Sequence, residues 1–121
     1  MARAMTEHER DVLTFMISYG EPWPGDEPVT EADRGRWLER LADVRVGARC
    51  TCRTCPSIEL EDAEGLVAMS EDNRVILDAP SYSAAIVLLF IDDDRPSYLE
   101  LAPIDGDRVF NEFPSVAELS G

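Results

Sequence analysis

Apolar residues first recur at helical spacing close to the N-terminus. They lie three and four positions apart, which places them on one face of a helix. These residues are Val12, Leu13, Phe15, Met16 and Tyr19. Thr6 and Glu9 are spaced as a capping box, in which each side chain binds the other residue's backbone N–H. Gly20 is a typical residue at a helix end. The pattern therefore predicts a helix over 7–19.

A second helical pattern follows a proline-rich loop. Residues 21–29 contain three prolines and a glycine, which neither a helix nor a central strand accepts. Thr30 and Asp33 then repeat the capping-box spacing. Trp37, Leu38 and Leu41 form an apolar stripe after them. We expect a second helix over 31–42.

The period changes from helical to two at residue 44. One face of the resulting strand carries Val44, Val46, Ala48, Cys50 and Cys52. The other face carries Arg45, Gly47, Arg49, Thr51 and Arg53. Strict alternation over this length predicts a strand at 44–53 with one buried face. A turn over 54–57 precedes a short strand at 58–60.

The rest of the chain has the pattern of short strands separated by turns. We predict strands over 66–70, 75–77, 84–91 and 98–102, with a short edge segment over 109–113. Residues 71–74, 92–96 and 105–106 are predicted turns, and 79–81 a break. Residues 84–91 are entirely apolar, which is typical of a central strand covered on both faces.

These elements predict an α+β fold, with two N-terminal helices packed on an antiparallel sheet of about five strands. At 121 residues the chain has the usual length of one domain, so we expect a single domain over 1–121. The sequence shows no internal repeat.

Composition and charge limit the classes of partner. The net charge is −14, and all 11 basic residues are arginine. Because phosphate groups attract Lys and Arg, this acidity argues against nucleic acids and anionic membranes as partners. The longest apolar run, 84–91, is far shorter than the roughly 20 residues of a spanning helix. No apolar segment follows the basic start, as a secretory signal would require, so we expect a cytoplasmic protein.

The negative charge is concentrated in the second half of the chain. Residues 56–121 contain 15 acidic residues and three arginines, against ten and eight in residues 1–55. An acidic surface attracts a basic protein, so we consider its loop aspartates as candidate interaction residues. They are Asp92, Asp93, Asp94, Asp105 and Asp107. One alternative is that the acidic residues form ion pairs with the arginines of 34–53 inside the protein. Another is that 92–96 is a solvated loop without a binding role.

Three cysteines form the most unusual local motif. Cys50, Cys52 and Cys55 are close enough in sequence to bind one soft metal ion such as zinc. A structural zinc site needs four ligands, and the candidate for the fourth is His8, the one histidine, or a residue of a second chain. One alternative is that Cys50 and Cys52 are small core residues. Another is that the flanking Arg49 and Arg53 lower a thiol pKa for redox sensing or nucleophilic use. His8 is otherwise an exposed residue at a helix start.

Three blocks of the sequence resemble small uncharacterised proteins of high-GC bacteria and their phages. The blocks are the helix start Thr6–Leu13, the stretch Val46–Leu60 with its Cys-Pro-Ser, and the pair Ile86–Phe90 and Ser97–Leu101 followed by Phe113-Pro114. The resemblance implies a shared fold unit and a bacterial or phage source. It implies no activity.

No catalytic motif accompanies these features, since phosphate-binding loops, dinucleotide fingerprints and nucleophile elbows are all missing from the sequence. We therefore expect a non-catalytic protein-interaction module, such as an inhibitor, an immunity-like protein or an adaptor, without a cofactor. A zinc-binding module centred on the cysteines is the alternative.

Overall fold

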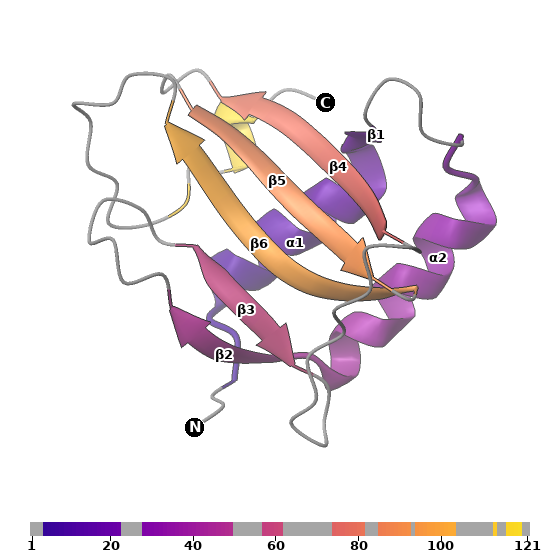
Figure 1. Ribbon diagram of the computed structural model, residues 1–121, viewed down its shortest axis with the longest axis horizontal. Coiled ribbons are helices and arrows are strands. Elements are labelled where there is room, and N and C mark those ends of the chain that lie inside the picture. Colours follow the sequence, from indigo (N-terminus) through magenta and orange to yellow (C-terminus); the bar gives the residue numbers. More distant parts are fainter. Residues whose placement is uncertain are drawn as a thin grey trace.

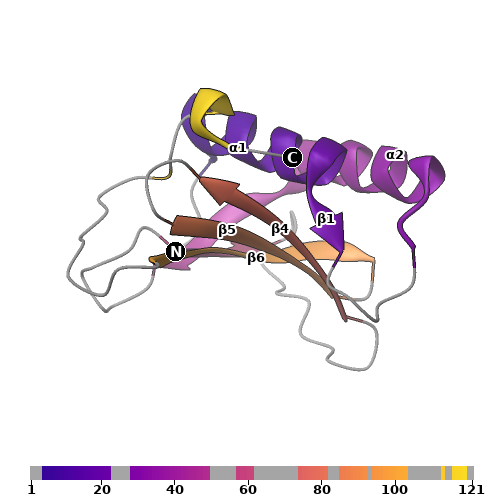
Figure 2. The same ribbon diagram turned by 90° about the horizontal axis from the view of Figure 1, so that it is seen from above.

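Two α-helices lie side by side on one face of a six-stranded antiparallel sheet (Figures 1 and 2). This computed structural model describes residues 4–22, 28–49, 57–61, 74–81, 85–92, 94–103, 113 and 116–119. The arrangement confirms the predicted α+β class, with one strand more than the expected number.

Helix α1 (Glu7–Tyr19) has the predicted bounds because its two ends are fixed locally. The Glu9 N–H donates to Thr6 Oγ1 at 3.1 Å, and the Thr6 N–H donates to Glu9 Oε1 at 2.9 Å. This reciprocal pair satisfies donors that a helix start otherwise leaves free. At the other end, the Gly20 N–H donates to the Met16 carbonyl at 2.8 Å.

Helix α2 (Glu31–Arg40) begins with a second capping box, between Thr30 and Asp33, and continues into the short 3₁₀ turn η1 (Leu41–Asp43). The Arg34 guanidinium donates to the carbonyls of Ile17 and Gly20, at 2.9 and 3.0 Å. An arginine of α2 therefore binds the carbonyl end of α1 and holds the two helices together. Within the described ranges, no helix is long and apolar enough to cross a membrane.

The six strands are all antiparallel to their neighbours and follow the order β1-β4-β5-β6-β3-β2. Their bounds are β1 (Glu21–Pro22), β2 (Arg45–Arg49), β3 (Ile58–Glu61), β4 (Arg74–Ser81), β5 (Ala85–Asp92) and β6 (Arg95–Pro103). A 3₁₀ turn, η3 (Val116–Glu118), lies near the C-terminus. Strand β5 is central, as the sequence predicted.

Two strand predictions were wrong in extent because proline was read as a strand breaker. The break predicted at 79–81 belongs to β4, where Pro80 pairs with Ile86. β1 borders β4 only at Leu77 and Asp78, so Pro80 lies beyond that pairing, at an edge position that proline accepts. The loop predicted over 92–96 is shorter, since β6 already begins at Arg95.

β1 itself forms inside the predicted loop of 21–29. The register of β6 then shifts at Ser97, because Phe90 pairs with Tyr98 while Ile91 pairs with Pro96. Such a bulge accommodates the proline. The segments 50–56, 66–73, 105–106 and 109–112 lie outside the described residues, and the predictions made for them stay predictions.

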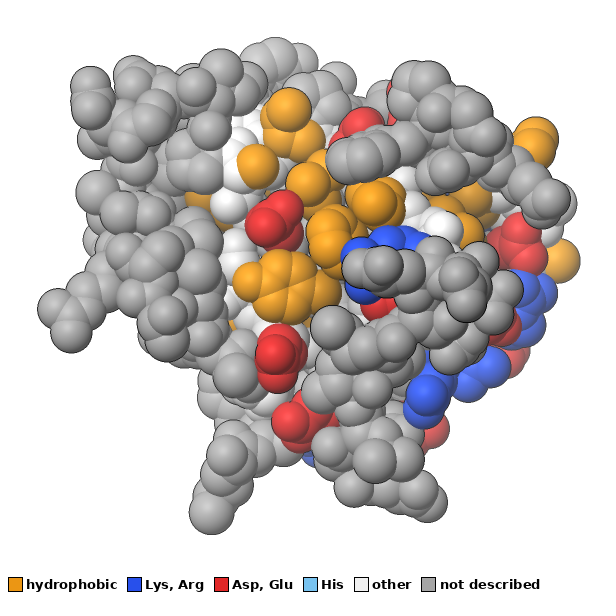
Figure 3. Space-filling view, in the orientation of Figure 1, with side chains coloured by type: hydrophobic (Ala, Val, Ile, Leu, Met, Phe, Trp, Pro, Cys, Tyr) orange, Lys and Arg blue, Asp and Glu red, His pale blue; other side chains and the backbone are white. Residues whose placement is uncertain are grey.

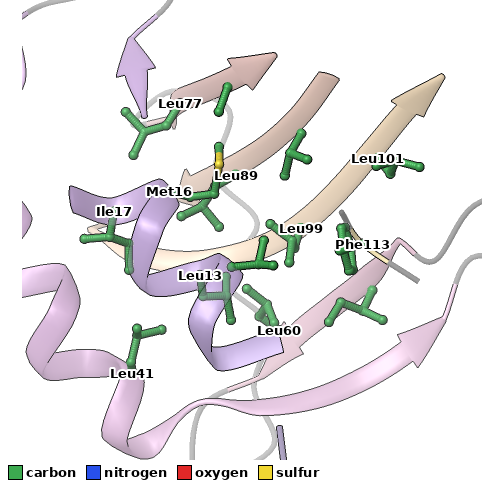
Figure 4. Packing of buried hydrophobic residues seen from close by; sticks show 14 of the residues in the cluster. Leu13, Met16, Ile17, Leu41, Leu60, Leu77, Leu89, Leu99, Leu101 and Phe113 are labelled. Carbon is green, nitrogen blue, oxygen red and sulfur yellow. The ribbon is translucent and has the colours of Figure 1, made fainter. Parts of the chain in front are cut away.

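The core lies between the helices and the sheet (Figure 4). From α1 it receives four side chains with no exposed area: Val12, Leu13, Met16 and Ile17. Leu77, Leu89, Leu99, Leu101 and Leu60 are among the sheet residues that face them. Three members of the predicted stripes differ from expectation, because Tyr19 is 63% exposed and both Phe15 and Leu38 are only partly buried.

Candidate functional site

Asp92, a candidate interaction residue, lies inside the molecule. Its side chain has no exposed area, and Arg74 Nε donates to Asp92 Oδ1 at 2.7 Å. Ser97 Oγ donates to Asp92 Oδ2 at 2.8 Å. The Arg74 guanidinium also lies 5.0 Å from the centroid of the Phe90 ring, where a cation–π contact forms. The Asp92 carboxylate is thus used internally, and its proposed role at an interaction surface needs correction.

Asp94 is also engaged within the fold. It occupies the hairpin turn between β5 and β6 with a φ of 65°, a left-handed conformation that Asp tolerates better than most residues. Arg36 donates to both of its carboxylate oxygens, at 2.6 and 2.8 Å, and the Trp37 indole donates to Oδ1 at 2.8 Å. The Arg40 guanidinium nitrogen Nη2 lies 3.6 Å from Asp94 Oδ2 and completes the group.

These contacts fasten α2 to the hairpin. Hydrogen bonds from Arg36 first, and then the bond from Trp37, lower the pKa of Asp94 to about 2, against the effect of its burial. The pairing of Arg36 and Arg40 with an aspartate of the later strands is the internal charge pairing that the sequence left as an alternative. The other candidates, Asp93, Asp105 and Asp107, lie outside the described residues.

The four candidate zinc ligands are only partly placed. Cys50, Cys52 and Cys55 lie outside the described residues, so the zinc hypothesis stays a prediction. His8 is half-buried, and its Nε2 donates to the Phe113 carbonyl oxygen at 2.6 Å, which ties the start of α1 to the C-terminal segment. Within the described ranges, no group of three His, Cys, Asp or Glu side chains could hold a metal ion.

A surface that the sequence did not single out lies on the face of the sheet opposite α1 and α2, which we call the outer face (Figure 2). Burial alternates along β5, so every second residue points away from the helices. By strand pairing, the outer face comprises Glu21, Glu59, Arg74, Ile76, Asp78, Ile86, Leu88, Phe90, Arg95, Tyr98, Glu100 and Ala102, all of them half-buried except the exposed Glu21. Figure 3 shows hydrophobic side chains at its centre, with both acidic and basic side chains beside them.

One row across the outer face alternates acidic and apolar side chains. Asp78 pairs with Leu88, and Leu88 pairs with Glu100 on its other side. Paired residues of antiparallel strands point to the same face. The row therefore places a leucine between two carboxylates.

The neighbouring row is mainly apolar and aromatic. Ile76 pairs with Phe90, and Phe90 with Tyr98, whose ring centroid is 5.9 Å away. Glu59 pairs with Tyr98 and ends the row with a third carboxylate. The two rows together form an apolar centre with acids at both sides and with the Arg74 guanidinium over the Phe90 ring.

The electrostatics at Asp78 are unfavourable in the free protein. Burial raises the pKa of the Asp78 carboxyl above its usual range, and the Glu21 carboxylate, which pairs with Asp78 across β1 and β4, raises it further. Like charges directly opposite each other destabilise a sheet. A cation that approached Asp78 would relieve both effects.

Sequence reasoning missed the outer face for an identifiable reason. It took 84–91 for a strand covered on both faces, because eight consecutive apolar residues hide any alternation. The signal that could have located this face is the alternation of Tyr98 and Glu100 with Leu99 and Leu101 along β6.

The chain was compared with protein-family models, curated proteins and solved structures, and none of them matches it. The assignment of function therefore depends on the geometry of the chain itself.

Proposed function

We propose that this protein is a non-catalytic interaction module that binds a basic protein partner through the outer face. The observation that supports the proposal is the row in which Leu88 lies between Asp78 and Glu100. An acidic surface alone would serve solubility, whereas an apolar centre with polar side chains around it is typical of a protein interface.

The charge of the whole chain favours a basic partner. Twelve of the 14 excess negative charges come after Cys55, in the half that supplies β3 to β6. Arg36 and Arg40 of the first half bind Asp94, and Arg74 binds Asp92. These arginines thus neutralise two hairpin aspartates, while Asp78 keeps an acidic neighbour across the strand pair.

Two double variants test the proposal. The outer-face variant combines Asp78→Asn with Glu100→Gln. The helix-side control combines Asp11→Asn with Glu39→Gln, which removes the same charge from exposed positions of α1 and α2. Partners captured from the source organism by the tagged wild type are identified by mass spectrometry, purified, and titrated calorimetrically against all three proteins.

We expect a basic partner that the wild type and the helix-side control bind equally and that the outer-face variant binds at least about tenfold more weakly. The wild-type affinity should fall as salt is raised from about 50 to 300 mM, because screening weakens attraction between exposed charges. A partner that binds the outer-face variant as tightly as the wild type would place the interface elsewhere and refute the proposal.

A further inference from the structure

The spacing of the acidic and apolar side chains on the outer face limits the backbone that can dock there. Asp78, Leu88 and Glu100 belong to three consecutive strands, β4, β5 and β6. Neighbouring strands are about 4.8 Å apart, so the two carboxylates stand about 10 Å apart with Leu88 at the midpoint. A complementary partner presents cation, apolar residue and cation at this spacing along one line.

An α-helix meets this spacing. Residues i and i+7 lie on the same side of a helix about 10.5 Å apart, and residues i+3 and i+4 lie between them on that side. An extended segment does not, because its side chains on one side repeat every 6.8 Å or so. Two of its cations would then be about 7 or 14 Å apart, and neither distance fits the pair of carboxylates.

The adjoining row gives such a helix an apolar surface to rest on. Ile76, Phe90 and Tyr98 lie next to the row of Leu88, about 7 Å along the strands. A helix is about 10 Å in diameter and covers both rows. On the inner face of the same sheet, α1 already runs across the strands, so this sheet accepts a helix in that direction (Figure 1).

From this geometry, and given the proposed interaction function, we infer that the outer face binds an α-helix of the partner protein. The helix lies across β4, β5 and β6, with Lys or Arg at positions i and i+7 on Asp78 and Glu100, and with apolar residues at i+3 and i+4 on Leu88. Charge complementarity selects this occupant over a second copy of the chain. The outer face carries the carboxylates of Glu21, Glu59, Asp78 and Glu100 against two arginines, Arg74 and Arg95, so two copies would bring faces of net negative charge together.

Three fluorescently labelled peptides of about 15 residues, with equal numbers of lysines and of leucines, test the inference by anisotropy. The first is an alanine-based helix with lysines seven apart and leucines at the two positions midway between them. The second is a helix with the lysines five apart, which places them on different sides. The third contains proline in the middle and alternates lysine and leucine, so that it stays extended. Circular dichroism checks the conformation of each peptide.

We expect the first peptide to bind the wild type and the helix-side control about tenfold more tightly than either of the others. This preference should vanish with the outer-face variant. If the extended peptide binds the wild type as tightly as the first, and the outer-face variant weakens both, then the helix inference is wrong while the interface stands.

If the three peptides bind all three proteins equally, the attraction is non-specific, and both the helix inference and the outer-face interface fail. Sedimentation of the protein alone examines the remaining occupant. A dimer that dissociates when Leu88 is replaced, as in Leu88→Ser, would assign the outer face to a second copy of the chain and overturn the helix inference.

Discussion

At the scale of single residues, the run Asp92–Asp94 shows how identical side chains acquire different roles. Asp92 is the last residue of β5 and pairs with Arg74 across β4 and β5. Its carboxylate is fully buried and forms an ion pair with the Arg74 guanidinium. Asp94 takes the left-handed turn conformation and binds α2. The sequence predicts a polar hairpin here, but the partners of each aspartate come from segments far away in the chain. Local pattern therefore could not separate their roles.

Replacement of Asp94 by alanine should lower the free energy of unfolding by about 2 kcal/mol at pH 7, because it removes a charged hydrogen-bond acceptor and strains the left-handed turn. Asp94→Gly should lower the free energy of unfolding by only about 1 kcal/mol, since glycine relieves the strain of the left-handed turn. Urea denaturation monitored by Trp fluorescence measures both. Equal stability of the two variants would contradict the role of the turn conformation.

The same carboxylate gives the protein a defined loss of stability in acid. The folded pKa of Asp94 is about 2, below the ordinary value of 3.8, so its contribution is fully present above about pH 4. It is lost as the pH falls from about 4 through 2, as the carboxylate gains a proton. We expect the stabilities of the wild type and Asp94→Asn to converge over this window, which denaturation at several pH values would show. A gap that stays constant down to pH 2 would contradict it.

At the scale of elements, the close approach of α1 to β4 depends on one glycine. A Cβ added at Gly20 would lie 2.5 Å from the Met16 carbonyl oxygen and 2.9 Å from the Leu77 Cβ. The last turn of α1 and strand β4 must therefore move apart to accommodate the methyl group. We expect Gly20→Ala to lower the free energy of unfolding by about 2 kcal/mol.

Gly35 provides the matched control. It lies within α2, and a Cβ added there meets nothing within 4 Å. Gly35→Ala should raise stability by about 0.5–1 kcal/mol, because alanine loses less backbone entropy in a helix. Thermal denaturation of the two variants compares them directly. If both glycine substitutions shifted stability in the same direction, the contact between α1 and β4 would not be the cause.

Elements were predictable where their signals are local. The bounds of α1 follow from Thr6, Glu9 and Gly20, all within or next to the helix. The strand order was not predictable, because the pairing of β3 with β6 joins segments about 40 residues apart and leaves no trace in local alternation. Pro80 and Pro96 misled for a related reason, since proline tolerance depends on whether a strand lies at an edge or contains a bulge.

At the scale of the whole molecule, the two faces of the sheet differ in what covers them and in their side chains. The inner face packs on α1 and α2 and forms the core. The outer face combines apolar residues with the carboxylates of Glu59, Asp78 and Glu100. Charge counting along the sequence located the excess of acidic residues in the second half of the chain. It then favoured the aspartates of the hairpin loop as candidate interaction residues. The described aspartates of that loop serve the fold, whereas the acids that we propose for partner binding are strand residues.

This division predicts that Asp78→Asn affects stability and binding in opposite directions. The folded pKa of Asp78 is raised by burial and by Glu21, so the ionised carboxylate disfavours the folded state. The penalty is absent below the ordinary value of 3.8 and grows as the pH rises through the folded pKa. Asp78→Asn should therefore raise the free energy of unfolding by about 0.5 kcal/mol at pH 7, the usual size of a cross-strand charge repulsion. Below about pH 3 it should leave the free energy of unfolding unchanged.

Binding of a basic partner should weaken in the same variant, because the carboxylate that repels Glu21 is the one that attracts the cation. Denaturation at pH 7 and at low pH, together with a binding titration at pH 7, separates the two effects. Asp11→Asn, on the exposed side of α1, should show neither the stability gain nor the loss of affinity. A variant that is more stable and binds less cannot owe its weaker binding to unfolding. Weaker binding accompanied by lower stability would instead assign Asp78 to the fold and remove it from the interface.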